Sequence, residues 1–237
     1  MLRSRAPGLY GWDILLMGTL GPGPVIGERL AFAIKSAADA GHEIGFHAWD
    51  HYTWQAHVDT MSSEAVHRSL EQGVAMLTKI TGKPPVTSAV PGWKCTDAAL
   101  LEKNKFPFRY NSDCRGDDIF LPVVGGRVLN QPQVPVNLPT YDEVIGRNGL
   151  LDENYNDYML NLIKPDAMNV LTIHAEVEGI SKLGLFSDFI GRFISKDGSF
   201  VPLGKLLPDG GITKKASVAK GPISGREGWV AVQGREI

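Results

Sequence analysis

The chain has 237 residues, 43% of them hydrophobic and 21% charged, which is ordinary globular usage and sufficient for a sizeable core. Its 24 Lys and Arg residues against 26 Asp and Glu residues give a net charge of −2, which does not favour a nucleic-acid partner. The sequence contains no apolar run of eighteen residues that could span a bilayer, and we expect a cytoplasmic protein.

Helical and strand patterns alternate along the chain. Helices are predicted over five ranges: 25–40, 62–81, 96–103, 155–163 and 185–194. Strands are predicted over six ranges: 43–47, 86–90, 108–112, 134–138, 169–173 and 200–203. Such alternation is typical of a parallel sheet with right-handed crossovers, as in an α/β barrel or an open doubly wound sheet. Residues 208–237 show little periodicity, and we expect a loop-like surface extension there.

Polar side chains follow several of the predicted strands. They are His47, His51, Trp93, Asp113, Arg115, Asp142, His174 and Glu176. Functional residues gather beyond the carboxyl ends of strands in both barrels and doubly wound sheets. A barrel takes about 30 residues per strand and helix, so six strands fall one or two units short of a complete barrel.

The segment Gly45–His51 carries the strongest local signal for chemistry. His47 and His51 lie four residues apart at the end of a predicted strand, where neutral imidazoles can bind a divalent metal. Asp50 could ligate the same metal or orient a histidine. The alternative is two ordinary histidines in an aromatic turn, because this spacing without a third ligand is common by chance.

His174 ends another predicted strand and has two interpretations. It is either a hydrogen-bonded structural group or the proton donor to a leaving amine, with Glu176 and Glu178 able to orient it. Asp113 and Arg115 by themselves indicate a turn with a salt bridge. The sequence has no nucleophile elbow and no phosphate-binding glycine loop, which leaves metal-assisted hydrolysis as the leading reaction class. Cys95 and Cys114 are expected to be reduced structural thiols.

Several blocks in order along the chain resemble one family. They are Leu9–Leu16, His47–His51, Arg109–Gly116, Leu138–Gly146, Thr172–Gly179 and Gly225–Trp229. Together they resemble the 4-deoxy-4-formamido-L-arabinose-phosphoundecaprenol deformylases, a branch of the polysaccharide deacetylase superfamily. The resemblance covers nearly the whole chain.

The resemblance implies a distorted (β/α) barrel and a divalent metal (Zn, Mn or Co) held by an Asp and two His. It implies removal of formyl from an amino sugar on a polyprenyl phosphate, at the cytoplasmic face of the inner membrane, for lipid A modification and polymyxin resistance. His47 and His51 match the metal histidines, and His174 matches the proton donor. Trp93, Asp113, Arg115 and Glu176 are expected to contact the substrate.

One part of the family pattern has no match here. The superfamily's first strand carries an Asp that acts as general base and a second Asp that binds the metal. We therefore expect a single domain over residues 1–237 that lacks its first one or two strands at the N-terminus. A two-histidine site without those carboxylates should hold metal weakly, and this chain alone should be inactive or marginally stable.

Two alternatives for the function remain open at this stage. One is deacetylation of another amino-sugar glycan, and the other is a non-catalytic remnant that binds a lipid-linked sugar or a partner. Aromatic and apolar residues near the start could rest on the inner-membrane surface, or they could form a buried loop. These residues are Tyr10, Trp12, Leu15, Leu16 and Met17.

Overall fold

The computed structural model describes residues 25–237, so the Leu9–Leu16 block and the suggested membrane contact at Tyr10–Met17 lie outside the described residues. The chain forms two compact units, each described by itself. The strand unit comprises residues 25–135, 202–223 and 227–237, and the helical unit comprises Val136–Val201 and Ser224–Arg226. No helix in the described part of the chain is both long and apolar enough to cross a bilayer.

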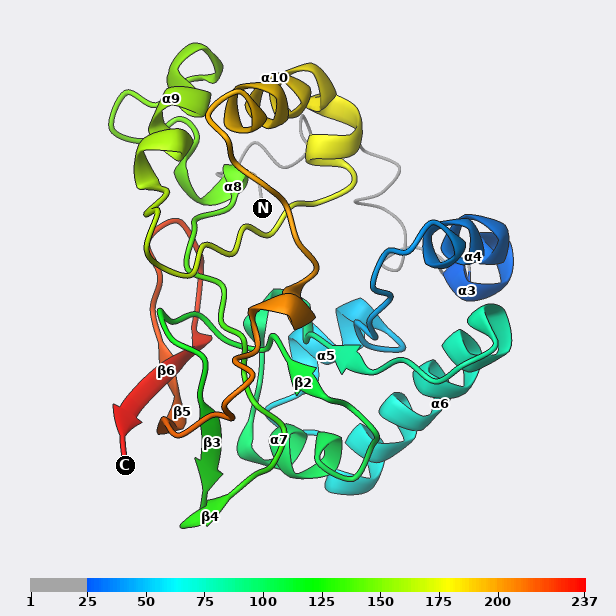
Figure 1. Ribbon diagram of the computed structural model, residues 1–237. Coiled ribbons are helices and arrows are strands. Elements are labelled where there is room, and N and C mark those ends of the chain that lie inside the picture. The colour runs from blue at the N-terminus through cyan, green and yellow to red at the C-terminus, as the bar shows by residue number, and fades with distance from the viewer. Residues whose placement is uncertain (1–24) are drawn as a thin grey trace. The chain divides into compact units, whose positions relative to one another are not determined.

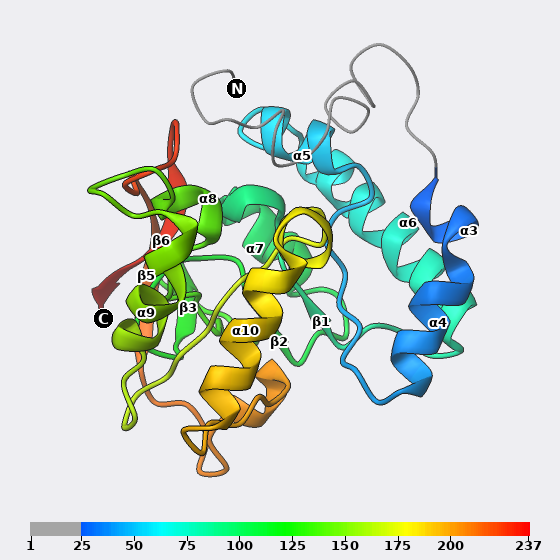
Figure 2. The ribbon, with the colours of Figure 1, turned by 90° about the horizontal axis from the view of Figure 1, so that it is seen from above.

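The strand unit contains five α-helices among its described residues. They are α3 (Ile26–Arg29), α4 (Ala31–Asp39), α5 (His51–His57), α6 (Ser63–Thr81) and α7 (Asp97–Lys103). Helix α6 confirms the expected helix over 62–81, because Ser62 caps its first turn and Gly82 ends it at φ 81°. Its apolar face buries Val66 and Leu70, and α4 lies alongside it (Figure 2).

A parallel ribbon at the centre of the strand unit follows the order of the chain. Strand β1 (Thr87–Ser88) pairs in parallel with β2 (Tyr110–Asn111). Single parallel bridges extend this ribbon, from Phe46 to Ser88 on one side and from Asn111 to Gln133 on the other. The strands expected at 43–47, 86–90, 108–112 and 134–138 thus contribute at most two paired residues each. Parallel neighbours in sequence order are what an α/β barrel requires.

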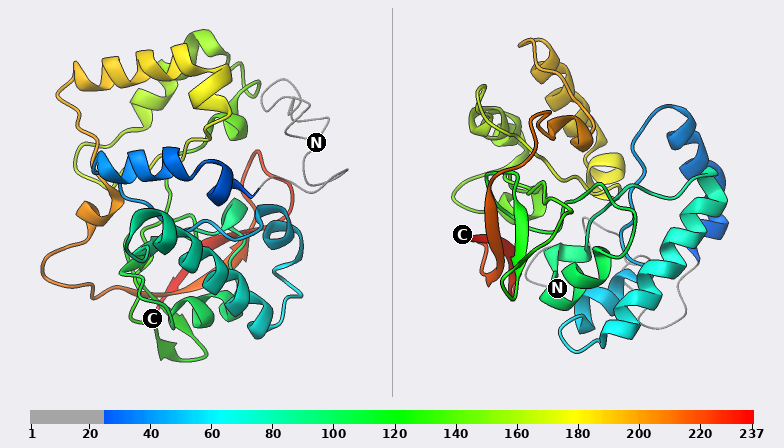
Figure 3. Two further views of the ribbon diagram at one scale, coloured as in Figure 1. Left: turned by 90° about the vertical axis from the view of Figure 1, so that its right-hand side faces the viewer. Right: turned by 60° about the horizontal axis from the view of Figure 1, so that its bottom comes forward.

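A second sheet in the strand unit was not expected. It has the order β4-β3-β5-β6, formed by β3 (Leu121–Val124), β4 (Arg127–Val128), β5 (Lys215–Gly221) and β6 (Val230–Glu236) (Figures 1 and 3). Residues 208–237 therefore differ from the expected loop-like extension, since Ala216, Val230 and Ala231 are buried. Gly125 and Gly126 both have positive φ, which is the requirement of a tight hairpin turn.

Among its described residues, the helical unit packs three α-helices and a π-turn around a separate core. These elements are α8 (Tyr141–Val144), α9 (Asp152–Leu162), η3 (Val177–Ser181) and α10 (Leu183–Ile194). Helices α9 and α10 lie side by side over a core that includes Tyr155, Met159 and Phe189 (Figure 1).

Two predicted strands near the helical unit are absent. Residues 169–173 pair with no strand of the described residues 25–237, although Leu138 N donates to Val170 O over 3.1 Å. The range 200–203 leads instead into the 3-10 turn η4 (Leu203–Leu206). Apolar content alone predicted these strands, and it does not specify a hydrogen-bonded partner.

Candidate active site

His47 and His51 are brought together by a turn and a helix cap. Phe46 N donates to Thr87 O over 3.0 Å, which ties the segment before His47 to β1. Ala48 has φ 62°, a left-handed conformation that turns the chain sharply. Asp50 then caps α5 by accepting Thr53 N over 2.7 Å, and His51 is the first residue of that helix. The two imidazole centroids lie 5.3 Å apart at an interplanar angle of 55°.

The surroundings of His47 favour its neutral form. Its Nδ1 lies 3.0 Å from the carbonyl oxygen of Ala89. Because a carbonyl can only accept, Nδ1 carries the hydrogen in this contact and Nε2 keeps its lone pair. Although the side chain retains an exposed surface, desolvation and the neighbouring His51 lower the pKa of His47 to about 4. A neutral imidazole is the form that binds metals.

The histidine pair fits two positions of a metal site. At a metal–nitrogen distance of about 2.0–2.1 Å, two imidazoles in a tetrahedral arrangement have centroids roughly 5 Å apart. Over residues 25–237, no group of three or more His, Cys, Asp or Glu side chains is arranged to hold a metal ion. Asp50, which the sequence offered as a ligand, serves as a helix cap.

The turn after β1 carries Trp93 and packs against α5, the helix that begins at His51. The 3-10 turn η2 (Pro91–Trp93) holds Gly92 at φ 57° and Trp93 at φ 53°. A left-handed aromatic residue is uncommon, and such strain persists where surrounding contacts enforce it. Here a Cβ on Gly92 would lie 2.9 Å from Gln55 Nε2 of α5. The guanidinium of Arg115 lies over the Trp93 ring, 4.8 Å from its centroid.

Asp113 is paired differently from the expectation. The sequence indicated an Asp113–Arg115 turn, but Asp113 accepts from Lys103 Nζ over 2.5 Å, and both side chains are at most 1% exposed. Gln133 Nε2 donates to the other carboxylate oxygen over 3.1 Å. Burial of a charge requires such partners. The sequence did not identify Lys103 and Gln133 as partners, because they are separated from Asp113 in the chain and match no motif.

His174 lies in the helical unit among carboxylates. Its Nδ1 is 4.0 Å from Asp142 Oδ1, and its backbone N donates to Glu178 Oε2 over 2.7 Å. Glu178 is buried, and desolvation raises the pKa of its carboxyl. Glu178 rather than Glu176 thus makes the direct contact with His174, while the half-buried Glu176 starts the π-turn η3.

A buried ion pair next to His174 was not predicted. Arg226 Nε donates to Glu143 Oε1 over 2.5 Å, and Arg226 Nη2 lies 3.9 Å from Asp142 Oδ2. Thr140 and Glu143 form a capping box at the start of α8. The Thr-x-x-Glu spacing was a signal in the sequence that could have identified Glu143.

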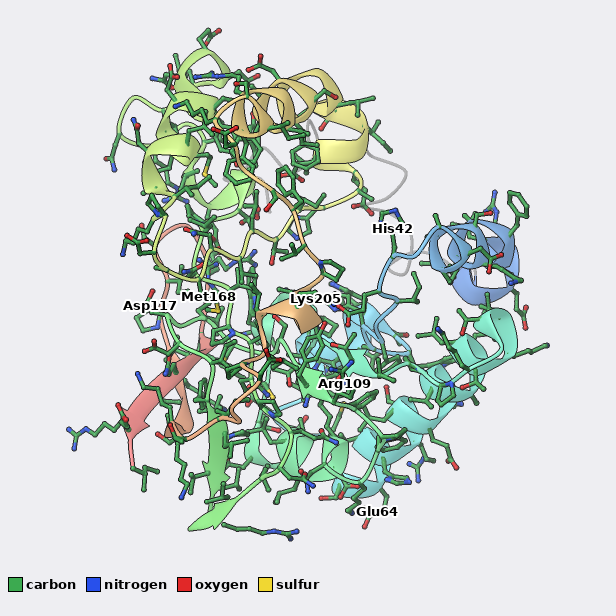
Figure 4. All side chains as sticks on the ribbon, viewed as in Figure 1. His42, Glu64, Arg109, Asp117, Met168 and Lys205 are labelled. Carbon is green, nitrogen blue, oxygen red and sulfur yellow. The ribbon has the colours of Figure 1, made fainter. Side chains whose placement is uncertain are left out.

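A cavity of about 750 Å³ lies at the other ends of the strands. It is lined by His42, Arg109 and Lys205, which Figure 4 labels, and by Val86. Val86 and Arg109 directly precede β1 and β2, whereas His47, Trp93 and Arg115 follow Phe46, β1 and β2. In barrels the chemistry occurs at the carboxyl ends of the strands, so we assign the candidate site to the histidine side.

Curated relatives match the chain over its full length. It is 50% identical to "Probable 4-deoxy-4-formamido-L-arabinose-phosphoundecaprenol deformylase ArnD" of Shewanella sediminis (strain HAW-EB3), over 100% of this chain and 77% of that protein. The protein of the same name from Wigglesworthia glossinidia brevipalpis is 37% identical over 100% of this chain and 83% of its own length. The polysaccharide deacetylase family pattern matches residues 27–111.

Solved structures with low identity share the fold. A structure assigned to the polysaccharide deacetylases from Mycobacterium smegmatis has a TM-score of 0.62 at 20% identity, covering 85% of this chain and 74% of that one. A polysaccharide deacetylase from Pseudomonas aeruginosa PAO1 has a TM-score of 0.60 at 18% identity, over 76% and 63% of the two chains. These likenesses confirm the expected α/β fold of the polysaccharide deacetylase type. Fold alone does not select a reaction.

Proposed function

The chain belongs to the 4-deoxy-4-formamido-L-arabinose-phosphoundecaprenol deformylases, within the polysaccharide deacetylases, and from this premise we propose that it is a hydrolase that removes formyl from the 4-amino group of that lipid-linked sugar. The single observation that carries the proposal is the 50% identity over the whole chain. The proximity of His47 and His51 supports it independently.

We propose that His47 and His51 hold a divalent metal, namely Zn, Mn or Co. The 5.3 Å spacing of the two imidazole centroids supports this proposal, as does the contact of Ala89 O with the His47 ring. When bound, such a cation polarises a carbonyl and lowers the pKa of water. The contact between His47 Nδ1 and Ala89 O would hold the Nε2 lone pair of His47 in a fixed direction for the metal.

We assign the proton transfer to His174, which would donate to the departing amine nitrogen. Glu178 fixes the His174 backbone, and Asp142 lies near the imidazole Nδ1. A carboxylate beside Nδ1 orients a histidine whose Nε2 faces the substrate. Trp93, Asp113, Arg115 and Glu176 are proposed to contact the substrate. Of these, Trp93 and Arg115 are buried against each other, with the Arg115 guanidinium over the Trp93 ring.

The proposed substrate places the reaction at a membrane surface. A sugar attached to undecaprenyl phosphate stays with the bilayer, so the enzyme would act at the cytoplasmic face of the inner membrane. Its products would be formate and the amino sugar still attached to its lipid carrier, and this amino sugar would serve lipid A modification and polymyxin resistance.

Formate release from the lipid-linked formamido sugar tests this proposal. If the 237-residue chain loaded with Zn²⁺, Mn²⁺ or Co²⁺ is active without the two aspartates of the family pattern, it should release formate from that substrate faster than acetate from its acetamido analogue. Preference for an acetylated glycan would instead support the other deacetylase reaction. Substrate binding without release of either acid would support a non-catalytic binding role.

A further inference from the structure

A second aromatic and cationic cluster lies directly after the Trp93 turn. Lys94 Nζ lies 4.2 Å and Lys220 Nζ lies 4.3 Å from the centroid of the Trp229 ring. The indole Nε1 of Trp229 donates to Asp59 Oδ2 over 3.0 Å, and Lys220 donates to the other oxygen of Asp59. We call these four residues the Trp229 cluster. All four belong to the strand unit.

The cluster joins segments that are far apart in the chain. Asp59 follows α5, Lys94 follows η2, Lys220 lies on β5, and Trp229 directly precedes β6. Gly228 has φ 77°, and a Cβ there would lie 3.5 Å from Lys94 Nζ. The Lys94 ammonium therefore lies against both the Trp229 ring and the backbone of Gly228.

The charges of the cluster do not balance. Asp59 pairs with Lys220, whose ammonium lowers the pKa of the Asp59 carboxyl. Lys94 has no carboxylate within 4.0 Å in the described part of the chain, and desolvation lowers the pKa of its half-buried ammonium. Two lysines against one aspartate leave one positive charge. A partly desolvated cation without an anion gains from a charge-assisted hydrogen bond to an incoming one.

The Trp229 cluster borders the residues proposed to contact the sugar. Lys94 follows Trp93, and its carbonyl accepts Trp54 Nε1 over 2.9 Å. Arg115 N donates to Ala231 O over 2.9 Å, which ties Arg115 to the strand that begins next to Trp229. If a ligand lies near Trp93 and Arg115, an anionic group on it would therefore lie near Lys94.

We propose that Lys94 and Lys220, positioned by Trp229 and Asp59, bind the phosphodiester group that links the sugar to its lipid carrier. This inference rests on the proposed function for the source of the phosphate. A phosphodiester carries a single negative charge, which matches the one uncompensated positive charge of the cluster. A lysine ammonium can donate a charge-assisted hydrogen bond to a free oxygen of such a group.

Binding of a soluble phosphodiester tests the cluster without turnover. The probe is geranyl methyl phosphate, compared with geraniol and with inorganic phosphate, and the readout is isothermal titration. Lys94→Gln with Lys220→Gln should raise the Kd of the diester by about tenfold or more, since a hydrogen bond to a charged group contributes that much. Lys215→Gln, an exposed lysine on the same strand, is the matched control and should leave the Kd unchanged.

Each outcome of the titration either supports or overturns the proposed phosphodiester site. Diester binding that is undetectable in the unchanged protein, or unaffected by the double substitution, overturns the proposal. Inorganic phosphate binding as tightly as the diester assigns the cluster to free phosphate and also overturns it. If the double variant fails to fold, as judged by circular dichroism, Lys94→Gln alone serves, because Lys94 makes no ion pair with the described residues. Lack of formate release would reject the proposed function, whereas this binding measurement does not depend on release.

Discussion

His47 and His51 of the strand unit have different neighbours from His174 of the helical unit. His47 faces a carbonyl and a second imidazole, and desolvation keeps it neutral. His174 instead has Asp142 near its ring and Glu178 on its backbone. The neighbouring groups thus give one residue type two different environments, which suit the two proposed tasks of metal binding and proton transfer.

Removal of a metal ligand should have the largest effect. His47→Ala should lower metal content and reduce turnover by about 10³-fold or more, because a bound cation supplies several kcal/mol of transition-state stabilisation. Elemental analysis after dialysis and formate release measure the two effects. The control is His57→Ala, an exposed histidine on α5 that should retain both. Unchanged metal content in His47→Ala would contradict the proposed site.

Removal of the proton donor should separate activity from metal binding. His174→Ala should reduce turnover by about 10²–10⁴-fold, the usual contribution of general acid catalysis, while metal content stays the same. The same elemental analysis and formate assay apply. Equal metal loss in His174→Ala and His47→Ala would show that His174 is itself a ligand, and the contrast between the two units would fail.

The two buried ion pairs should differ in their contribution to stability. Lys103→Met leaves the fully buried Asp113 carboxylate without its cation and should lower the free energy of unfolding by about 3–5 kcal/mol. Arg226→Met should cost less, because the Arg226 side chain is 17% exposed and Glu143 keeps the Thr140 backbone N–H. Urea denaturation of both variants measures the difference. Equal losses of unfolding free energy in the two variants would mean that the difference in burial does not determine how much each ion pair contributes to stability.

Two helical glycines offer a matched comparison of packing. A Cβ on Gly73 of α6 would lie 1.7 Å from the Phe46 ring, so Gly73→Ala should destabilise the protein by about 1–3 kcal/mol. No atom lies within 4 Å of a Cβ on Gly191 of α10, so Gly191→Ala should stabilise it by about 0.5–1 kcal/mol. Thermal melting distinguishes the signs. Unchanged stability in Gly73→Ala would show that α6 does not pack tightly against Phe46, the residue before His47.

The pH dependence of stability should have opposite signs in the two units. His47 has a folded pKa of about 4, below its ordinary 6.5, so its contribution is complete above pH 6.5 and is lost as the pH falls towards 4. Glu178 has a folded pKa raised above 4.5, so its contribution is complete below pH 4.5 and is lost as the pH rises through the folded value.

Urea denaturation of the metal-free protein between pH 4 and 7 measures both terms. His47→Gln should weaken the loss of stability on acidification, and Glu178→Gln should weaken the loss as the pH rises. The effects are the smallest of those expected here, because His47 retains exposed surface and solvent screens its charge. Parallel pH profiles for the two variants and the unchanged protein would contradict the assigned environments.

Local sequence determined the bounds of α6 and α7 and the proximity of His47 and His51, whereas the helix expected at 25–40 is interrupted at Leu30, the one expected at 155–163 begins at Asp152, and α5 was not predicted. Ser62, Thr96 and Gly82 occupy the cap positions that their side chains or backbone freedom favour. His47 and His51 are four residues apart, so one turn and one helix start suffice to bring their rings together. These features depend on contacts between near neighbours, which a sequence shows directly.

Tertiary structure decided the features that depend on distant partners. The turn with left-handed Gly92 and Trp93 lies against Gln55 of α5, and Asp113 pairs with Lys103 and Gln133 rather than with Arg115. The strand pattern of residues 215–221 and 230–236 is weak in the sequence. They become strands because β5 pairs with β3 and with β6. Strand pairing and buried charge are properties of the surroundings of a residue, and only the folded chain supplies those surroundings.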